Sequence, residues 1–300
     1  MEKVKYIQLS NLQTSYSSHN KLAKLYADIH SCSWDFIIIN FEKVSFISAN
    51  QFSVLGCILT SFLIQHKNTK ISFTNLSPKI KEIMQVNGFG KHFSLEPLPD
   101  KNNTAIPYKI FNVSQIDEFE RYIGISIFNR NDLPRMSCGV RDRITDNILE
   151  IFNNVKEHTK SELLYTCGQY FPRKGFLYFT IVDSGETIPH NVSEYLKDSG
   201  KSLNQSETAL HWALQCGNST RRTNSPGGLG LYFLSDFIKL NKGELYIVSG
   251  NETFEQTAKY GQRYKSLSVP FQGTIVTMAF NLSDTSSYCL SSEDLTDLIF

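Results

Sequence analysis

The chain has 300 residues, 41% of them hydrophobic, and its 30 Lys and Arg residues nearly balance 29 Asp and Glu residues, so the formal net charge is +1. This balance argues against a dedicated surface for nucleic acid or for an anionic membrane, so partners have to be inferred from sites. The longest apolar run, residues 52–64, is too short to cross a bilayer and is interrupted by Ser, Thr and Gly, which predicts a buried helix and no membrane span. A chain of this length can form two ordinary domains with two cores.

The six cysteines are scattered along the chain, form no CxxC pair and follow no N-terminal secretory signal. This usage is typical of reduced thiols that serve as small apolar or surface side chains. We therefore expect a cytoplasmic protein without disulfides.

The first part of the chain alternates between strand patterns and helix patterns. Strands are predicted at residues 4–9, 36–41 and 70–73, and helices at residues 21–30, 52–64 and 78–86. Pro78 starts the last helix and Gly88 follows its end. The order β, α, β, α, β, α predicts a small α/β layer with a mainly parallel sheet.

This part, with FIIINFEKVSFISANQFSVL at its centre, resembles a STAS domain, the fold of bacterial anti-sigma factor antagonists. In that family a serine at the helix start, in a segment like DSSGL, is phosphorylated by a partner kinase. Ser48, Ala49 and Asn50 stand at the matching positions, and Ala49 and Asn50 carry no hydroxyl. The resemblance therefore implies a docking or scaffold domain without the phosphorylation switch, in which Asn50 or Ser48 caps the helix. Ser48 as a substitute phosphoacceptor is the alternative.

A polar stretch with prolines, residues 95–107, predicts a join near residue 103, which divides the chain into parts 1–103 and 104–300. The second part is expected to contain strands at residues 105–113, 162–171, 175–183, 244–249 and 274–280, and helices at residues 116–122 and 142–158. The strands at 162–171 and 175–183 are separated by a short turn, which predicts an antiparallel hairpin. Within the polar segment 190–226 we expect one helix, at residues 207–216.

The helix at residues 142–158 carries an apolar stripe, and beside it Glu150, Asn154 and His158 repeat at i, i+4 and i+8. A carboxylate, a carboxamide and an imidazole in one line indicate a site, although a solvated helix face is the plainer explanation. For His158 alone, hydrogen bonding to the last carbonyl groups of the helix is an equal alternative.

A second motif, IVDSGETIP, places Asp183 where a buried strand meets a glycine turn. A buried carboxylate can accept a hydrogen bond from an exocyclic amine, and Gly185 would let the backbone pass close to a flat ring. Ile188 completes the DxGxxIP pattern. Taken alone, this motif more often marks an ordinary turn.

A third motif, GGLGL, directly precedes an apolar-periodic helix and comprises Gly227, Gly228, Leu229, Gly230 and Leu231. Glycines at a helix N-terminus free backbone N–H groups to hold phosphate. The structural alternative is a flexible hinge before a core helix.

These three motifs, followed by Gly273 and Thr274 at the start of a strand, make residues 105–282 similar to the GHKL ATPase superfamily, which includes gyrase, histidine kinases and anti-sigma factor serine kinases. By resemblance, Asn154 would bind Mg²⁺ and Glu150 would be the catalytic base. Asp183 would bind the adenine amine with support from Thr274, and the glycine loop would hold the phosphates of ATP. The expected fold is mixed α/β (α+β): a STAS-like β/α domain followed by a GHKL (Bergerat) two-layer α/β sandwich.

Two features depart from the family pattern. Thr187 stands where a second glycine is usual, and a β-branched residue does not readily adopt a positive φ, so the turn there should differ. Residues 251–272 form an insertion whose polar run TAKYGQRYK could be a loop for a partner.

We therefore expect an ATP- and Mg²⁺-binding regulatory protein, an ATPase or a protein serine kinase-like phosphotransferase, whose lid at residues 190–226 controls docking of a protein partner. That partner could itself be STAS-like, and a homodimer through the first strand of the second part is compatible with the pattern. The alternative is a catalytically inactive interaction module, which Thr187 favours and the retained Glu150, Asn154 and Asp183 oppose. A sensor histidine kinase is a weaker alternative, because no dimerisation hairpin with a phosphorylatable histidine precedes the domain.

Overall fold

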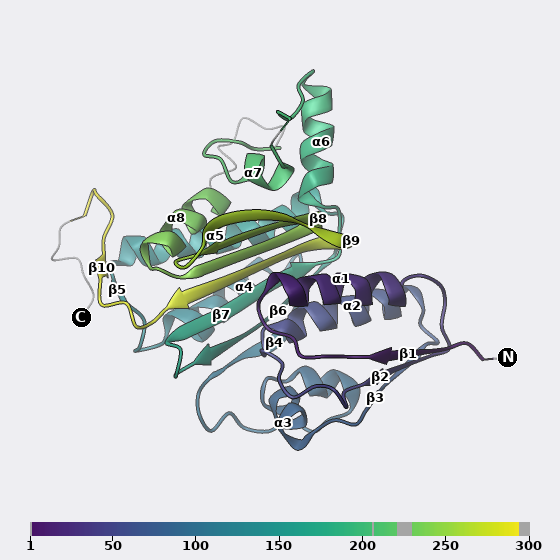
Figure 1. Cartoon of the computed structure of the whole chain (residues 1–300). Helices are drawn as coiled ribbons and strands as arrows, with labels where there is room; N and C mark the ends of the chain where they lie inside the picture. The colour runs from purple at the N-terminus through teal and green to yellow at the C-terminus, as the bar shows by residue number, and fades with distance from the viewer. Residues whose placement is uncertain (1, 206, 221–229, 294–300) are drawn as a thin grey trace.

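The computed structural model describes residues 2–205, 207–220 and 230–293, which form a mixed α/β fold with two main sheets (Figure 1). One sheet has three parallel strands, and the other has five antiparallel strands. The mixed α/β class predicted from the sequence is therefore confirmed.

The N-terminal sheet is built from strands that helices connect. Its elements are β1 (Val4–Gln8), α1 (Tyr16–Ile29), β2 (Phe36–Asn40), α2 (Gln51–Gln65) and β3 (Lys70–Thr74), followed by α3 (Pro78–Val86) and a 3-10 helix at Phe89–Phe93. Strand β2 lies between β1 and β3 and runs parallel to both. The predicted order of elements and the parallel pairing are confirmed.

Helices from the C-terminal part of the chain cover one face of the C-terminal sheet (Figure 1). In spatial order its strands are β4 (Ala105–Asn112), β6 (Leu163–Phe171), β7 (Phe176–Asp183), β9 (Gly261–Asn281) and β8 (Glu244–Thr257). The helices on that face are α4 (Ile116–Ile123), which continues as a π-helical turn at Gly124–Phe128, α5 (Cys138–His158) and α8 (Gly230–Leu240). A short parallel pair, β5 (Arg135–Met136) with β10 (Ser287–Tyr288), lies outside the sheet. Strands β6 and β7 form the predicted antiparallel hairpin.

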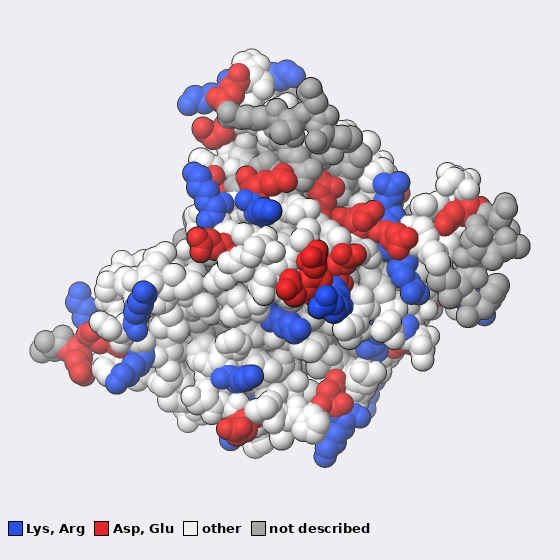
Figure 2. Space-filling model, turned by 180° about the vertical axis from the view of Figure 1, so that it is seen from behind, with Lys and Arg blue, Asp and Glu red and all other residues white. Residues whose placement is uncertain are grey.

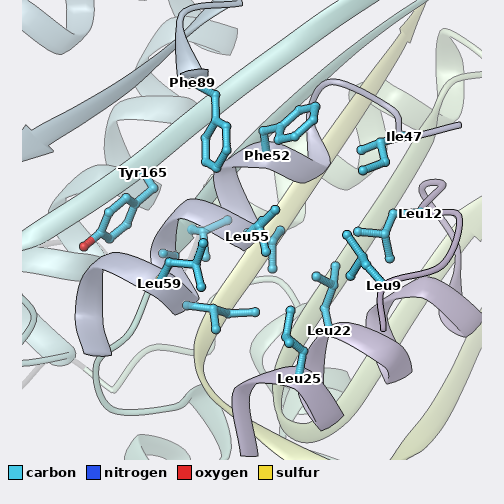
Figure 3. Close-up of a cluster of buried hydrophobic side chains, with 14 of the residues drawn as sticks. Leu9, Leu12, Leu22, Leu25, Ile47, Phe52, Leu55, Leu59, Phe89 and Tyr165 are labelled. Carbon is cyan, nitrogen blue, oxygen red and sulfur yellow. The ribbon is translucent and has the colours of Figure 1, made fainter. Parts of the chain in front are cut away.

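Helices α1 and α2 lie between the two sheets and cover the face of the C-terminal sheet that α4, α5 and α8 leave free (Figure 1). One apolar cluster contains Leu22 of α1, Leu55 and Leu59 of α2, and Tyr165 of β6, which Figure 3 draws together. The described residues form two large apolar clusters, as the length of the chain suggests, and a small one within residues 192–209, but the join near residue 103 does not divide the two large clusters. The two parts of the chain therefore share a core.

The start of α2 differs from the prediction that Asn50 or Ser48 caps this helix through its side chain. Asn50 is the residue before the helix, but no side-chain hydrogen bond caps its first turn. The Asn50 amide instead donates to Thr14 Oγ1 at 3.0 Å and to Thr180 Oγ1 of β7 at 2.9 Å. Since Asn50 is fully buried, its amide has to be paired inside the protein. Thr180 of the C-terminal sheet provides one of its two partners.

The prediction for the polar segment 190–226 is wrong in two respects. Helix α6 (Ile188–Asp198) was not predicted, and the helix expected at residues 207–216 is reduced to α7 (Ala209–Ala213). Thr187 caps α6 by accepting a hydrogen bond from the His190 N–H group, and Val192 and Leu196 are buried one turn apart. We call α6 and α7 the lid helices. Residues 206 and 221–226 of this segment lie outside the described residues.

Residues 251–272, the insertion whose polar run 257–265 was expected as a loop for a partner, continue β8 and β9 as a long antiparallel hairpin. This extension contacts α1: Tyr16 Oη donates to the Ser266 carbonyl at 2.7 Å, and the Ser268 N–H group donates to Asn20 Oδ1 at 2.9 Å. Pairing of residues 252–257 with residues 261–266, after a register shift at Gly250, and these contacts hold the inserted segment against the N-terminal part.

Three further expectations concern the surface and the thiols. No helix among the described residues is long and apolar enough to cross a membrane. All six cysteines are free, and Cys57 and Cys167 are buried. On the face in Figure 2, Lys and Arg side chains are interspersed with Asp and Glu side chains, in keeping with the balanced composition.

Candidate functional site

A cavity lies between α5, the end of β7 with the paired residues of β9, and the lid helices. Its empty space, including the open mouth, is about 860 Å³. Aliphatic side chains form much of its wall: Ile151, Val155, Ile181, Val192, Leu231 and Val276. Polar side chains, among them those of Glu150, Asn154 and Asp183, line the rest of it.

The floor of the cavity contains Asp183, the last residue of β7, which pairs with Thr274 of β9 and is 3% exposed. The Gly185 N–H group donates to Asp183 Oδ1 at 2.8 Å. Burial raises the pKa of the Asp183 carboxyl from its usual 3.8 to about 7, although hydrogen bonds from Gly185, Thr274 and Thr159 oppose this shift. The carboxyl is thus a buried acceptor whose charge is costly without a further donor.

Two glycines allow the backbone to pack closely around Asp183. A Cβ added at Gly273, where φ is +110°, would lie 2.0 Å from the Asp183 carbonyl oxygen. A Cβ added at Gly185 would lie 2.1 Å from the Thr159 carbonyl oxygen. No side chain fits at either position without moving the backbone, so both glycines are required by this geometry.

Helix α5 forms one wall and presents Glu150 and Asn154 to the cavity. Ser137 caps the start of α5 by accepting a hydrogen bond from the Val140 N–H group at 3.2 Å. Ile148 and Phe152 are fully buried in the cluster beneath the sheet, which orients the helix. The apolar stripe therefore fixes which face of α5 lines the cavity.

Glu150 is in close contact with the start of α8. A Cβ added at Gly230, the first residue of α8, would lie 2.6 Å from Glu150 Oε2. The absence of a side chain at Gly230 thus lets the carboxylate occupy the gap between the two helices. Leu231, the next residue, lines the cavity itself.

Thr187 shows how the turn after β7 differs from a glycine-containing turn. Its φ is −88° and its ψ is 155°, which any L-residue adopts, and α6 begins at the next residue. The turn therefore needs no glycine, and Thr187 has a structural role as a helix cap.

The structure brings most of the predicted site residues together. Those that line the cavity are Glu150, Asn154, Asp183, Ile188, Leu231 and Thr274. Gly185 and Gly230 support it from behind through the contacts given above. His158 is the last residue of α5, and its side chain lies outside the described part of the structure, as do Gly227, Gly228 and Leu229.

Several lining residues were not predicted from the sequence: Thr159, Glu186, Asn191, Trp212, Asn218, Ser219 and Thr220. Thr159 directly follows α5, so continuing the helix face by one residue would have found it. The lid residues carry no comparable signal, because a short helix brings them to the cavity. Among the described residues, no group of three or more His, Cys, Asp and Glu side chains is placed to hold a metal ion.

Comparison of the chain with models of known protein families and with curated proteins finds no match in either. The class of protein is therefore described from the fold and the cavity alone. This is a mixed α/β protein with a largely apolar cavity that is also lined by a few polar groups.

Proposed function

We propose that the chain binds an adenine nucleotide together with Mg²⁺ in this cavity, as a GHKL-type ATPase or a protein serine kinase-like phosphotransferase. The observation that carries the proposal is that residues of separate motifs line one cavity. Glu150 and Asn154 come from α5, Asp183 from the end of β7, Leu231 from the start of α8 and Thr274 from β9. The same polar residues scattered over the surface would not support a site.

The floor of the cavity suits the adenine ring. Asp183 is an acceptor in a buried position, and an exocyclic amine would supply the donor that its carboxylate lacks. Thr274 lies beside it in the strand pairing, and its hydroxyl interacts with Ser249 Oγ at 2.8 Å. Ile181 and Val276 provide the apolar contact that a flat heterocycle needs.

The wall formed by α5 suits the phosphate end of the ligand. Mg²⁺ prefers oxygen ligands and takes few of them from the protein, so Asn154 could provide one neutral oxygen without a protein cluster. Bound Mg²⁺ would supply charge neutralisation for the phosphates. Glu150 lies one helical turn from Asn154 on the cavity side and could accept a proton from water or a hydroxyl group.

The N-terminal part is proposed to be a STAS-like unit that has become part of the scaffold. Ser48, Ala49 and Asn50 are 6%, 2% and 0% exposed. The Ala49 N–H group donates to Gln169 Oε1 at 3.2 Å, and Asn50 donates to Thr180, so this segment contacts the C-terminal sheet. Burial of these positions supports the loss of a phosphorylation switch and opposes Ser48 as a substitute acceptor.

We further propose that this is a cytoplasmic regulatory protein in which nucleotide alters the lid and thereby the docking of a protein partner. The rival proposal, an inactive interaction module, depended on Thr187. Since Thr187 caps α6, its presence does not disfavour a working cavity. The two proposals differ in nucleotide binding, which can be measured directly.

Calorimetry of the full chain with a non-hydrolysable ATP analogue, with and without Mg²⁺, tests the proposal. We expect saturable binding that Mg²⁺ strengthens and that Asp183→Asn weakens. Absence of heat in both conditions would contradict the proposal and favour the interaction module.

Phosphate release then separates catalysis from binding. Glu150→Gln is expected to lower release at least about a hundredfold if Glu150 is the base. Asp146→Asn is the matched control, because Asp146 lies one turn earlier on α5, is exposed and does not line the cavity. Equal rates for wild type and Glu150→Gln would remove Glu150 from the catalytic role.

A further inference from the structure

The β8–β9 hairpin holds the short lid helix α7 in place. Both carboxylate oxygens of Glu252 in β8 accept hydrogen bonds from the first turn of α7, from the Ala209 N–H group at 3.2 Å and from the Leu210 N–H group at 2.8 Å. A helix of five residues is not stable by itself, so these bonds matter for its position. Glu252 does not line the cavity.

Helix α7 places Trp212 in the wall of the cavity. The Trp212 ring contacts Tyr195 of α6, with ring centroids 5.8 Å apart and planes at 46°. It also packs against the small apolar cluster of the lid helices, formed by Val192, Leu196 and Ala209. The indole is half-buried, and no hydrogen bond of its N–H group to another described residue is present. A large aromatic surface is thus available to a ligand.

We propose that Trp212 packs on the planar ring of the bound ligand and that Glu252 is the positioning residue that keeps Trp212 there. The inference rests on the proposed function, since the flat ring is that of the nucleotide. Ile181 and Val276 line the cavity from the sheet, and Trp212 lines it from the lid. A planar heterocycle between these walls contacts aliphatic groups on one side and an aromatic ring on the other.

Glu255, three residues further along β8, provides a matched control. Its carboxylate accepts a hydrogen bond from the Tyr16 N–H group of α1 at 3.1 Å and pairs with Lys265 at 2.9 Å. It is a paired carboxylate on the same strand whose contacts are with α1 and β9. Loss of Glu255 removes a comparable charge without removing the bonds to α7.

The first experiment measures the ring contact. In a Trp34→Phe background Trp212 is the only tryptophan, so its emission is expected to change on titration with the non-hydrolysable ATP analogue. Calorimetry is expected to give wild-type affinity for Trp212→Phe and about tenfold weaker binding for Trp212→Leu. Equal affinity of the Phe and Leu variants would overturn the ring contact.

The second experiment measures positioning by Glu252 and includes a readout without nucleotide. In the Trp34→Phe background, acrylamide quenching of Trp212 is expected to increase with Glu252→Ala, to recover in part with Glu252→Gln, and to stay unchanged with Glu255→Ala. Nucleotide binding is expected to weaken about fivefold in Glu252→Ala. Unchanged quenching in Glu252→Ala would overturn the positioning role.

The outcomes separate this inference from the proposed function. If wild type and all variants bind nucleotide equally, the inference fails and the proposed function stands. If wild type binds none, the proposed function and the ring contact fail together, and the quenching comparison alone decides whether Glu252 positions Trp212.

Discussion

The Asn50 amide donates a hydrogen bond to the Thr180 hydroxyl of β7 at 2.9 Å, and both residues are fully buried. Thr180 in turn interacts with Thr277 Oγ1 of β9 at 2.7 Å. This chain of polar groups crosses the contact between α2 and the C-terminal sheet, in an otherwise apolar core. The two parts of the chain are therefore connected by specific hydrogen bonds as well as by apolar packing.

Asn50→Leu is expected to lower the free energy of unfolding by about 1–3 kcal/mol, because the Thr14 and Thr180 hydroxyls lose a buried partner. Urea denaturation of the full chain measures this change. In a double-mutant cycle, Asn50→Leu with Thr180→Val should cost less than the sum of the single changes.

Asn102→Ala, at an exposed position, is the matched control and should change stability by no more than about 0.5 kcal/mol. Full additivity of Asn50→Leu and Thr180→Val would show that the hydrogen bond does not couple the two parts.

The local elements of this fold could be predicted because their signals are periodic and short. The apolar stripe identified α5, and Pro78 and Gly88 marked the two ends of α3. The packing of α2 could not be predicted in the same way, although a signal was present: α2 is apolar on all sides, which indicates a helix buried on more than one face. The sequence does not show that the second face of α2 packs on β6 and β7, which come much later in the chain.

Some residues of the candidate site could be predicted from the sequence, and others could not. Glu150 and Asn154 share a helix face, so their common direction followed from spacing alone. Trp212 reaches the cavity only because Glu252, from a distant strand, holds α7, and no local pattern encodes that contact. Helix α6 was missed because the threonine before it was compared with a glycine turn, when its hydroxyl acts as a helix cap.

His19 of α1 is expected to make stability sensitive to acid. The ring is 2% exposed and its Nε2 atom has no hydrogen-bond partner among the described residues. Burial lowers the pKa of His19 from 6.5 to about 4, against the opposing effect of Glu255. A lowered folded-state pKa stabilises the protein above pH 6.5, and this contribution of up to about 3 kcal/mol is lost as the pH falls through 4.

Urea denaturation of wild type and His19→Leu at pH 7 and pH 4.5 measures the effect. The variant should lose less stability than wild type between these conditions. An identical loss in both proteins would mean that another group causes the acid sensitivity.

Asp183 is expected to have the opposite effect to His19 on the pH dependence of stability. Because burial raises the pKa of its carboxyl from 3.8 to about 7, its contribution to stability is complete below pH 3.8 and is lost as the pH rises through 7. Relative to Asp183→Asn, wild type should therefore lose up to roughly 4 kcal/mol between pH 4 and pH 8. Taking the difference between the two proteins at each pH cancels the effect of His19. A constant difference would contradict the conclusion that burial outweighs the hydrogen bonds of this carboxyl and raises its pKa.

Gly230→Ala is expected to impair catalysis more than binding. The added Cβ would lie 2.6 Å from Glu150 Oε2 and 2.9 Å from Glu150 Cβ, so the carboxylate has to move from its place beside α8. Phosphate release should fall at least about tenfold if Glu150 is the base, with a loss of about 1–3 kcal/mol in stability from overpacking. Gly124→Ala is the matched control, since a Cβ there meets no atom within 4 Å and φ is −53°. Its stability should be unchanged or slightly higher. If Gly230→Ala instead released phosphate at the wild-type rate, the position of Glu150 beside α8 would have no part in the reaction.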